Sequence, residues 1–331
     1  MSSSPRITVI IATYNRARLL AHAVESVRRQ TVSDWELLVV GDACTDESAA
    51  VVAAAADPRV QFVNLPVNAG EQSAPNNEGL RRARGRAVAF LNHDDLFFPD
   101  HLELALTQLD HERADFVWSP LLVALPAVDD GGRAAETFRL SGVPFSADYD
   151  PRIFVFASSW VCTRALAEQV GPWRPARELF VSPSQDWLFR AWTSGARMRV
   201  QPRPTVLAVP SSARAGSYLA AGSDEHDRLA TAMHGDPAFR ARALQSAALS
   251  GERDANAYRF GARWGESLRA LVFRPVAAAA MALGVHPHAP LAALRYGRRG
   301  NLVSAIRRKS GLPALGGRPP RPATSPDGRT S

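Results

Sequence analysis

The first 91 residues alternate between strand-like and helix-like segments, and this alternation limits the fold more than any other feature. Residues 7–12 (ITVIIA) form a run rich in β-branched residues, which is typical of a strand buried on both faces of a parallel sheet. An amphipathic helical pattern with an apolar face from Leu19 to Val27 follows. Further strand patterns then alternate with helical ones: strands at 36–40, 60–64 and 87–91, helices at 46–56 and 77–84. The sequence therefore predicts an α/β fold with a mostly parallel sheet flanked by helices.

Polar residues follow each of the four predicted strands. They are Thr13, Tyr14 and Asn15 after the first strand, Asp42 after the second, Asn68 and Gly70 after the third, and Asn92 to Asp95 after the fourth. Ligands of parallel α/β sheets bind at the carboxyl ends of the strands. We therefore expect these four loops to converge on one site.

The fourth of these loops, NHDD at residues 92–95, places two adjacent carboxylates at the end of a buried strand. Buried carboxylates are costly unless a cation meets them, and Mg²⁺ or Mn²⁺ prefers oxygen ligands and can bridge a diphosphate. Adjacent side chains on an extended chain point to opposite sides, so His93 is expected to be structural if Asp94 faces an ion. The same pattern also fits carboxylates that only begin a loop.

Three further residues have both a functional and a structural interpretation. Asp42 could accept hydrogen bonds from a nucleobase or ribose, or only form a turn. Tyr14 could stack on a base, or be a partly buried aromatic residue. Asp186, in SQDWLFR near the start of a predicted helix over 184–194, could be a general base, or form a structural i,i+4 pair with Arg190.

The net charge of +7 belongs to the C-terminal end of the chain. From Arg295 onward there are nine basic residues and one acidic residue, so residues 1–294 sum to about −1. No recognisable nucleic-acid-reading module accompanies this charge, so no nucleic-acid partner is expected. The basic stretch is either a solvated terminus or a contact to an anionic membrane surface.

The cysteines and the apolar segments indicate a cytoplasmic location. Only Cys44 and Cys162 occur, without paired spacing, which favours neither a disulfide framework nor a structural zinc site. The N-terminus lacks the pattern of a signal peptide, and the apolar run over 276–285 is too short to span a bilayer. Peripheral attachment to the inner face of the cell membrane stays open as an alternative.

Taken together, these residues resemble family 2 glycosyltransferases, which have the GT-A (Rossmann-like) nucleotide-sugar-binding fold. The matching segments are ITVIIATYNRARLLAHAVESVRRQT, WELLVVGDACTDES, NAGEQSAPNNEGLRRARGRAVAFLNHDDLFFPDHLE and SQDWLFRAW. The resemblance is dense over residues 6–110 and thinner to about 210. We therefore place a GT-A catalytic domain at 1–210, with a nucleotide-sugar-binding half over 1–115 and an acceptor half over 116–210. A helical C-terminal extension over 211–310 and a disordered basic tail over 311–331 are expected to follow.

The resemblance implies an enzyme that moves a sugar from a nucleotide-diphosphate donor to an acceptor hydroxyl, with inversion and with Mn²⁺ or Mg²⁺. Tyr14 would stack on the base, Asp42 would bind the base or ribose, and Asp186 would be the general base. Asp94 would be the principal metal ligand and Asp95 a secondary one. The rest of the nucleotide-sugar site is expected to comprise Thr13, Asn15, Asn68, Gly70, Asn77 and Asn92.

The sequence departs from the family pattern at three positions. Gly41 replaces the first Asp of the usual pair after the second strand, Asn92 replaces the first Asp of the D-x-D motif, and Asn76 replaces an Arg. Asn92 would weaken metal affinity, and Asn76 removes one expected cationic contact. A degenerate member that binds a nucleotide or glycan without turnover is therefore the alternative.

Other motifs narrow the activity. The Q-x-x-R-W motif of processive synthases does not follow Asp186, which favours a non-processive enzyme. The first strand is followed by ATYNRARLL and not by the G-x-G-x-x-G of dinucleotide-binding enzymes. The expected acceptor is a glycan or a lipid-linked sugar, as in bacterial cell-envelope polysaccharide biosynthesis. The donor sugar and its nucleotide stay open.

Overall fold

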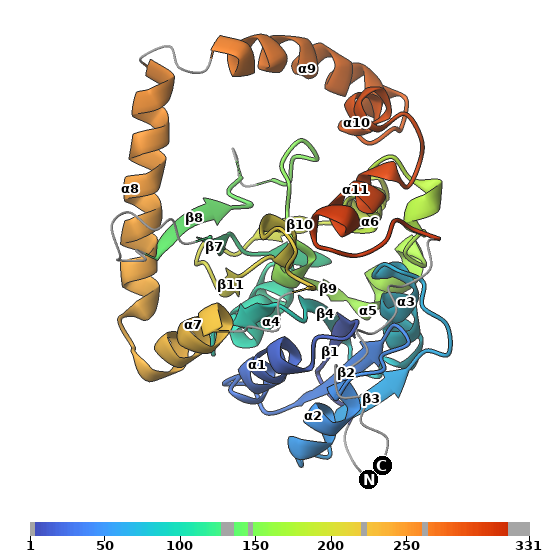
Figure 1. Cartoon of the computed structure of the whole chain (residues 1–331), viewed down its shortest axis with the longest axis vertical. Helices are drawn as coiled ribbons and strands as arrows, with labels where there is room; N and C mark the ends of the chain where they lie inside the picture. Colours follow the sequence, from blue (N-terminus) through green and yellow to red (C-terminus); the bar gives the residue numbers. More distant parts are fainter. Residues whose placement is uncertain (1–3, 127–135, 145–147, 220–223, 260–263, 317–331) are drawn as a thin grey trace, which may run out of the picture.

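A computed structural model describes residues 4–126, 136–144, 148–219, 224–259 and 264–316. A seven-stranded sheet forms its centre, in the order β10-β6-β9-β4-β1-β2-β3 (Figure 1). The strands are β1 (Ile7–Thr13), β2 (Trp35–Gly41), β3 (Val60–Asn64), β4 (Ala87–Asn92), β6 (Phe116–Trp118), β9 (Trp160–Thr163) and β10 (Met198–Val200). Strands β1 to β4 are mutually parallel, and β9 runs antiparallel between β4 and β6. The predicted α/β fold with its mostly parallel sheet is confirmed.

Strand register aligns the ends of the parallel strands. Thr13 of β1 pairs with Gly41 of β2, and Ala12 pairs with Asn92 of β4. The polar loops after these three strands therefore begin at one level on one edge of the sheet. This is the arrangement that the alternating pattern predicted.

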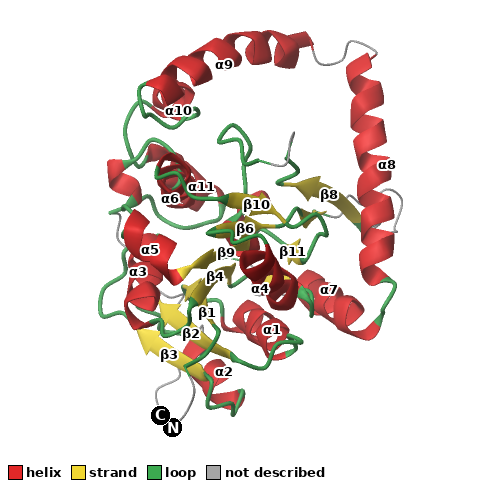
Figure 2. Ribbon diagram, turned by 180° about the vertical axis from the view of Figure 1, so that it is seen from behind, coloured by secondary structure: helices red, strands yellow, loops and turns green. Residues whose placement is uncertain are grey.

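Two helical layers cover the sheet (Figure 2). On one face, α1 (Ala17–Arg28), α2 (Ser48–Ala54) and α4 (His101–His111) pack on the side chains of Ile7, Val9 and Ile11. On the other face lie α3 (Ser73–Arg82), α5 (Arg164–Val170) and α6 (Pro183–Thr193). Because both faces are covered, the central strands are mostly apolar, and the buried polar pair Thr8–Glu36 satisfies itself through a hydrogen bond of 2.7 Å.

The core beneath α5 and α6 is rich in tryptophan. The rings of Trp160, Trp173 and Trp187 stack on one another with centroids 5.8–6.0 Å apart, and Phe90 meets Trp173 edge-on at 5.0 Å. Such aromatic pairs add stabilisation beyond the area that they bury. This rigid block holds the start of α6, where Asp186 lies, against β4.

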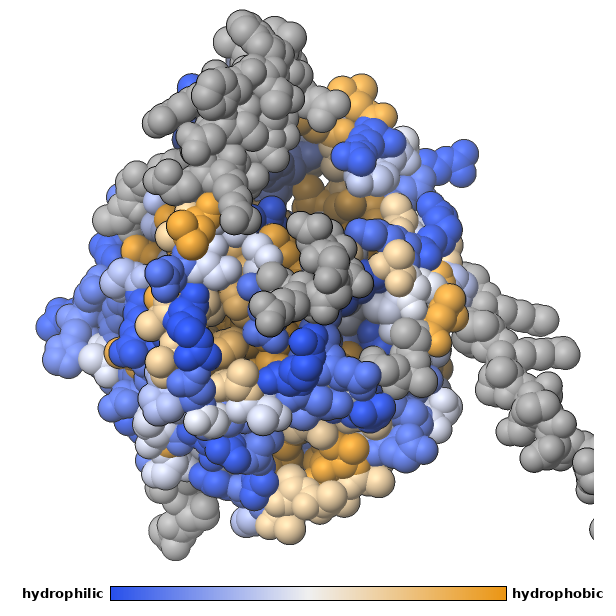
Figure 3. Space-filling view, turned by 60° about the vertical axis from the view of Figure 1, so that its left-hand side comes forward, coloured by the Kyte–Doolittle hydropathy of each residue, from blue (hydrophilic) through white to orange (hydrophobic). Residues whose placement is uncertain are grey.

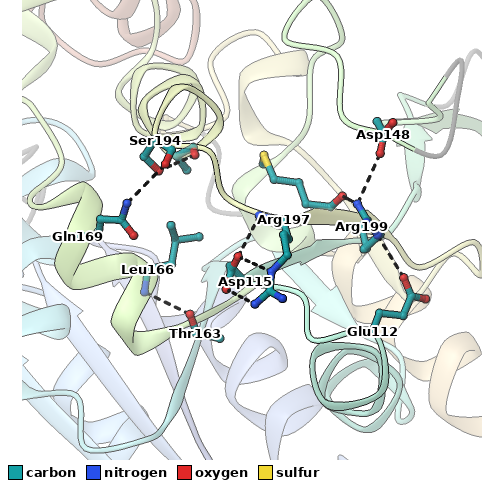
Figure 4. Close-up of polar contacts among 11 residues, drawn as sticks. Glu112, Asp115, Asp148, Thr163, Leu166, Gln169, Ser194, Arg197 and Arg199 are labelled. Carbon is teal, nitrogen blue, oxygen red and sulfur yellow. Dashed lines mark hydrogen bonds and ion pairs between the residues drawn. The ribbon is translucent and has the colours of Figure 1, made fainter.

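Ion pairs fasten the far edge of the sheet (Figure 4). Asp115 lies just before β6, and Arg197 lies just before β10. The Asp115 carboxylate accepts a hydrogen bond from the Arg197 guanidinium at 3.1 Å. Arg199 of β10 reaches both Glu112 and Asp148 at 3.4 Å. These contacts are partly exposed and contribute chiefly to strand position.

A second, four-stranded sheet has the order β5-β11-β7-β8. Its strands are β5 (Asp95–Phe97), β7 (Leu121–Leu125), β8 (Thr137–Ser141) and β11 (Val206–Ala208). Strand β5 begins at Asp95, which pairs with Ala208 of β11. The chain therefore passes from the first sheet into the second within the predicted metal motif.

The C-terminal part is helical. Its helices are α7 (Asp224–Gly235), α8 (Phe239–Arg259), α9 (Trp264–Ala282), α10 (Ala289–Tyr296) and α11 (Asn301–Lys309). Side chains of α7 and of the start of α8 pack on the second sheet, and α8 and α9 then form an arch that returns the chain to α6 (Figure 1). Hydrophilic residues cover most of the side that carries α7 and α8, with apolar residues in small groups between them (Figure 3).

Part of the stretch expected to be a disordered basic tail falls within the described residues. Residues 311–316 of the predicted tail are described and pack beside α11, whereas 317–331 lie outside the described residues. Among the helices of the described ranges, none is long and apolar enough to cross a membrane.

Candidate functional site

A cavity of about 310 Å³ lies at the carboxyl ends of β1, β2 and β4. Its walls include the strand ends, residues 70–75 at the start of α3, Ser182 and Pro183 at the start of α6, and a C-terminal wall from residues 210–218 and α11. Six of the predicted site residues line it: Thr13, Tyr14, Asp42, Gly70, Asn92 and Asp94.

Asp42 connects β2 to the loop that follows β3. Its two carboxylate oxygens accept the backbone N–H groups of Ala69 at 2.7 Å and Gly70 at 2.8 Å, while its own carbonyl accepts from the Asn68 side chain at 2.7 Å. Burial raises the pKa of Asp42, and the two amides and the charge of Arg307 lower it in part. Each carboxylate oxygen keeps a second lone pair, so Asp42 can also accept from a ligand in the cavity.

Asp94 faces the cavity from the end of β4. One of its oxygens accepts the backbone N–H of Ser211 at 2.7 Å, which ties the metal motif to the loop over 210–218. Burial acts to raise the pKa of Asp94, but the charge of His93 and hydrogen bonds from Ser211 outweigh it and keep that pKa below its usual value.

Asp95 lies outside the cavity lining and is 1% exposed. One of its oxygens accepts from Ser158 Oγ at 2.5 Å and from Asn92 Nδ2 at 2.9 Å, and the other accepts from Val209 N at 3.1 Å. Burial and the neighbouring Asp94 raise the pKa of Asp95 to about 7. In this arrangement Asp95 fastens the two sheets together, and it does not present a free oxygen to the cavity as the sequence analysis expected of a metal ligand.

His93 does line the cavity, and both of its ring nitrogens have partners. Nδ1 lies 3.2 Å from the carbonyl of Ala12, and Nε2 lies 3.4 Å from the hydroxyl of Tyr218. Burial lowers the pKa of His93. The contacts give His93 a structural part, but His93 and Asp94 both line the cavity, so the alternation of side chains that was expected to turn His93 away does not hold here.

Three asparagines predicted at the site hold backbone instead of lining the cavity. Asn15, with a positive φ of 47°, bonds Thr45 at 2.8 Å. Asn68 holds Asp42, as described above. Asn77 forms a reciprocal pair with the backbone of Trp173, at 2.8 and 2.9 Å. None of the three belongs to the residues that line the cavity.

Asp186 lies in the first turn of α6, beside the cavity and not in its lining. Ser182 and Pro183, at the beginning of the helix, do line it. The Asp186 carboxylate is 8% exposed as a residue and accepts from Arg190 Nε at 2.9 Å, with Arg174 at 3.5 Å. The i,i+4 pair of Asp186 with Arg190 that the sequence indicated is therefore present, and Arg174 supplies a second cation beside the carboxylate.

The C-terminal wall contains residues that the sequence analysis did not select. Arg307 donates to the carbonyl of Gly70 and, at 2.8 Å, to that of Pro313. Tyr218 forms part of the same wall, with the Arg16 guanidinium 4.1 Å from its ring centroid. Glu71 also lines the cavity, and burial raises its pKa. The charge pattern gave a weak signal for Arg307, but no local motif indicated these three residues.

Two observations bear on ligand and metal binding. The Thr13 hydroxyl is buried in the cavity wall without a hydrogen-bond partner among the described residues, so the wall carries an unsatisfied polar atom. Within the same described ranges, no group of three or more His, Cys, Asp or Glu side chains is arranged to hold a metal ion. A metal here would need ligands beyond protein side chains.

Comparisons with known proteins agree with this architecture. The family model described as "Glycosyl transferase family 2" matches residues 8–166. The succinoglycan biosynthesis protein ExoO of Rhizobium meliloti is 37% identical over 135 residues, covering 40% of this chain and 37% of that protein. The uncharacterized glycosyltransferase YwdF of Bacillus subtilis is 31% identical over 169 residues, covering 50% and 61%.

Among solved structures, S. aureus TarS 1–349 in complex with UDP-GlcNAc superposes with a TM-score of 0.51 and 19% identity. The match covers 92% of this chain and 88% of that one. At this identity the likeness shows the fold, which is GT-A. The chain spans between about a seventh and three fifths of the length of the first curated relatives that it matches.

Proposed function

We propose, from the membership of residues 8–166 in glycosyl transferase family 2, that this chain is an inverting, non-processive glycosyltransferase. The observation that carries the proposal is the convergence of Tyr14, Asp42 and Asp94 from three separate strand ends on one cavity. The donor is a nucleotide-diphosphate sugar, and the acceptor is the hydroxyl of a glycan or a lipid-linked sugar.

The donor class rests on the site and on the relatives. Tyr14 is half-buried at the cavity wall, so its ring can cover a base, and Asp42 can accept a hydrogen bond from the base or ribose. The Thr13 hydroxyl and Asn92 supply further polar atoms. Because TarS was solved with UDP-GlcNAc, UDP sugars are the first donors to test.

Asp94 would hold the divalent metal, with Asn92 beside it. Mg²⁺ and Mn²⁺ sites in nucleotide enzymes commonly use one or two carboxylates and take their other ligands from substrate phosphates and water, which suits this sparse donor set. When bound, the metal neutralises charge on the leaving diphosphate. The protein then only needs to hold Asp94 in place, which the Ser211 amide does.

Asp186 would accept the proton of the attacking hydroxyl. Its position at the start of α6 places it beside the cavity, and Arg190 and Arg174 orient the carboxylate. Proton transfer to a positioned carboxylate requires an acceptor hydroxyl within hydrogen-bond reach of Asp186.

The test is donor turnover with Mn²⁺, using a panel of UDP, GDP and dTDP sugars. We expect the wild type to hydrolyse or transfer one of them, Asp94→Ala to lose both diphosphate binding and turnover, and Asp186→Asn to lose turnover while still binding the nucleotide. A wild type that binds a nucleotide yet turns over no donor would instead favour the degenerate binding module, for which Asn92 and Asn76 are the motivation.

The biosynthesis of a cell-envelope polysaccharide is the proposed setting, because ExoO is named for succinoglycan biosynthesis. Contact with an anionic membrane through the basic residues after 316 (Arg318, Arg321 and Arg329) would bring the enzyme to a lipid-linked acceptor. Sedimentation with anionic vesicles tests this: full-length protein should partition more strongly than protein ending at residue 316, and equal partitioning would remove the idea.

A further inference from the structure

The donor cavity contains an arginine from the last described helix. Among the described residues that line the cavity, Asp42, Glu71 and Asp94 are acidic, and Arg307 of α11 is the one Lys or Arg. A nucleoside diphosphate is an anion, so a wall with three carboxylates needs cationic groups to accept it. Arg307 is the side chain of this wall that supplies one.

The guanidinium of Arg307 is not neutralised by an ion pair within the described residues. Its hydrogen-bond partners are the backbone carbonyls of Gly70 and Pro313. Its charge acts on Asp42 and Glu71 from a distance, and burial lowers its pKa, which reflects partial removal from water. A desolvated arginine held by neutral carbonyls is available for a charge-assisted hydrogen bond to a ligand.

Backbone hydrogen bonds hold helix α11 at both ends. Gly300, at its start, donates to the carbonyl of Leu179 at 2.8 Å. At its end, the carbonyls of Lys309 and Ser310 accept the amides of Gly216 and Tyr218 at 2.8 and 2.9 Å. The position of Arg307 beside Gly70 is therefore set by backbone contacts.

We propose that Arg307 is a donor-binding residue that contacts the nucleoside diphosphate, so that α11 completes the donor site from the C-terminal side. This inference rests on the proposed function.

Arg308 provides a matched control, because it is the next residue on the same helix, carries the same charge and is exposed. Binding of UDP, GDP and dTDP to the wild type would be measured by calorimetry in Mn²⁺, and the tightest ligand taken forward. We expect Arg307→Ala to raise its Kd about 10-fold to 100-fold, the range for a lost charge-assisted hydrogen bond. Arg308→Ala should stay within about twofold of the wild type.

Steady-state kinetics separate binding from a structural effect. Arg307→Ala should raise the donor KM and also lower kcat, because negative charge grows on the diphosphate as it leaves and the contact strengthens in the transition state, whereas Arg308→Ala should change neither. If Arg307→Ala lowers the melting temperature, Arg307→Lys is the variant used to test donor binding. Lysine keeps the positive charge but lacks the planar guanidinium, which can donate two parallel hydrogen bonds. For Arg307→Lys we expect a nucleotide Kd at least threefold above that of the wild type.

A wild-type Kd in Arg307→Ala, or in Arg307→Lys where that variant decides, would overturn the inference, and so would an equal loss in Arg308→Ala. Failure of the wild type to bind any of the three nucleotides is a different outcome. It would overturn the proposed function, and the inference with it.

Discussion

Replacing Asp42 with Asn should loosen the loop that carries Gly70 and weaken nucleotide binding. In the wild type both carboxylate oxygens accept backbone N–H groups, from Ala69 at 2.7 Å and from Gly70 at 2.8 Å. The amide oxygen of Asn can accept only one of them. Its NH₂ group would then face the other N–H, leaving one backbone donor without an acceptor.

The cost follows from these two contacts. A hydrogen bond to a charged group contributes about 1.5–3 kcal/mol, and a buried donor left unpaired costs about 1–3 kcal/mol, so the loop should lose about 2–4 kcal/mol of anchoring free energy. The loop residues around Asn68 are exposed, so the loss acts as local opening and not as global unfolding. If that free energy must be restored on binding, the nucleotide Kd rises about 30-fold to 1000-fold.

Calorimetry with the best nucleoside diphosphate and hydrogen exchange at the Gly70 amide measure the two effects. Asp46→Asn is the control, because Asp46 also holds backbone N–H groups, of Ala17 at 2.9 Å and Ser48 at 3.1 Å, but does not line the cavity. That variant should lose stability and keep its nucleotide affinity. The reasoning fails if Asp42→Asn binds within twofold of the wild type with the Gly70 amide still protected.

Two further predictions concern the scaffold. Burial lowers the pKa of His101 to about 3, so the unfolded chain gains a proton first and stability falls as pH drops below about 6.5, by about 1.4 kcal/mol per unit. Between pH 7 and pH 5, urea unfolding of His101→Gln should therefore lose about 2 kcal/mol less stability than the wild type, and equal losses would refute this. Gly85→Ala should lower the melting temperature by several degrees, since its Cβ would lie 2.5 Å from the backbone nitrogen of Thr8. Gly251→Ala, in the exposed part of α8 with nothing within 4 Å, should leave it equal or higher, and a similar loss in both variants would contradict the steric argument.

The fold was predictable because it depends on local periodicity. The strands at 36–40, 60–64 and 87–91 correspond to β2, β3 and β4, since apolar runs between amphipathic helices leave a parallel sheet as the simplest way to bury both. The second sheet was not predicted. Its strands are short and pair across long sequence separations, as Asp95 with Ala208 does, and periodicity carries no information on such pairing.

A polar residue after a strand did not by itself predict whether that residue lines the cavity. Asp42 and Asn68 follow neighbouring strands, yet Asp42 lines the cavity while Asn68 holds the carbonyl of Asp42. Asn77 holds the backbone of Trp173 in the same way. Loops contain backbone groups without strand or helix partners, and a short amide side chain can satisfy them. Polar residues after strands therefore either face a ligand cavity or bind the backbone of the loop, and their spacing in the sequence does not distinguish the two roles.

The contribution of α11 shows why the remaining part of the site escaped prediction. The basic stretch was interpreted as one unit because charge density is a property of a sequence window. In three dimensions its members separate: Arg308 is exposed, whereas the neighbouring Arg307 lines the donor cavity and bonds Gly70. One residue of difference on a helix rotates a side chain by about 100°, so burial divides adjacent arginines that composition treats as equal. If Arg307 binds the donor, the specificity of such a domain depends partly on the C-terminal helices that follow the sheet, and not only on its strand-end motifs.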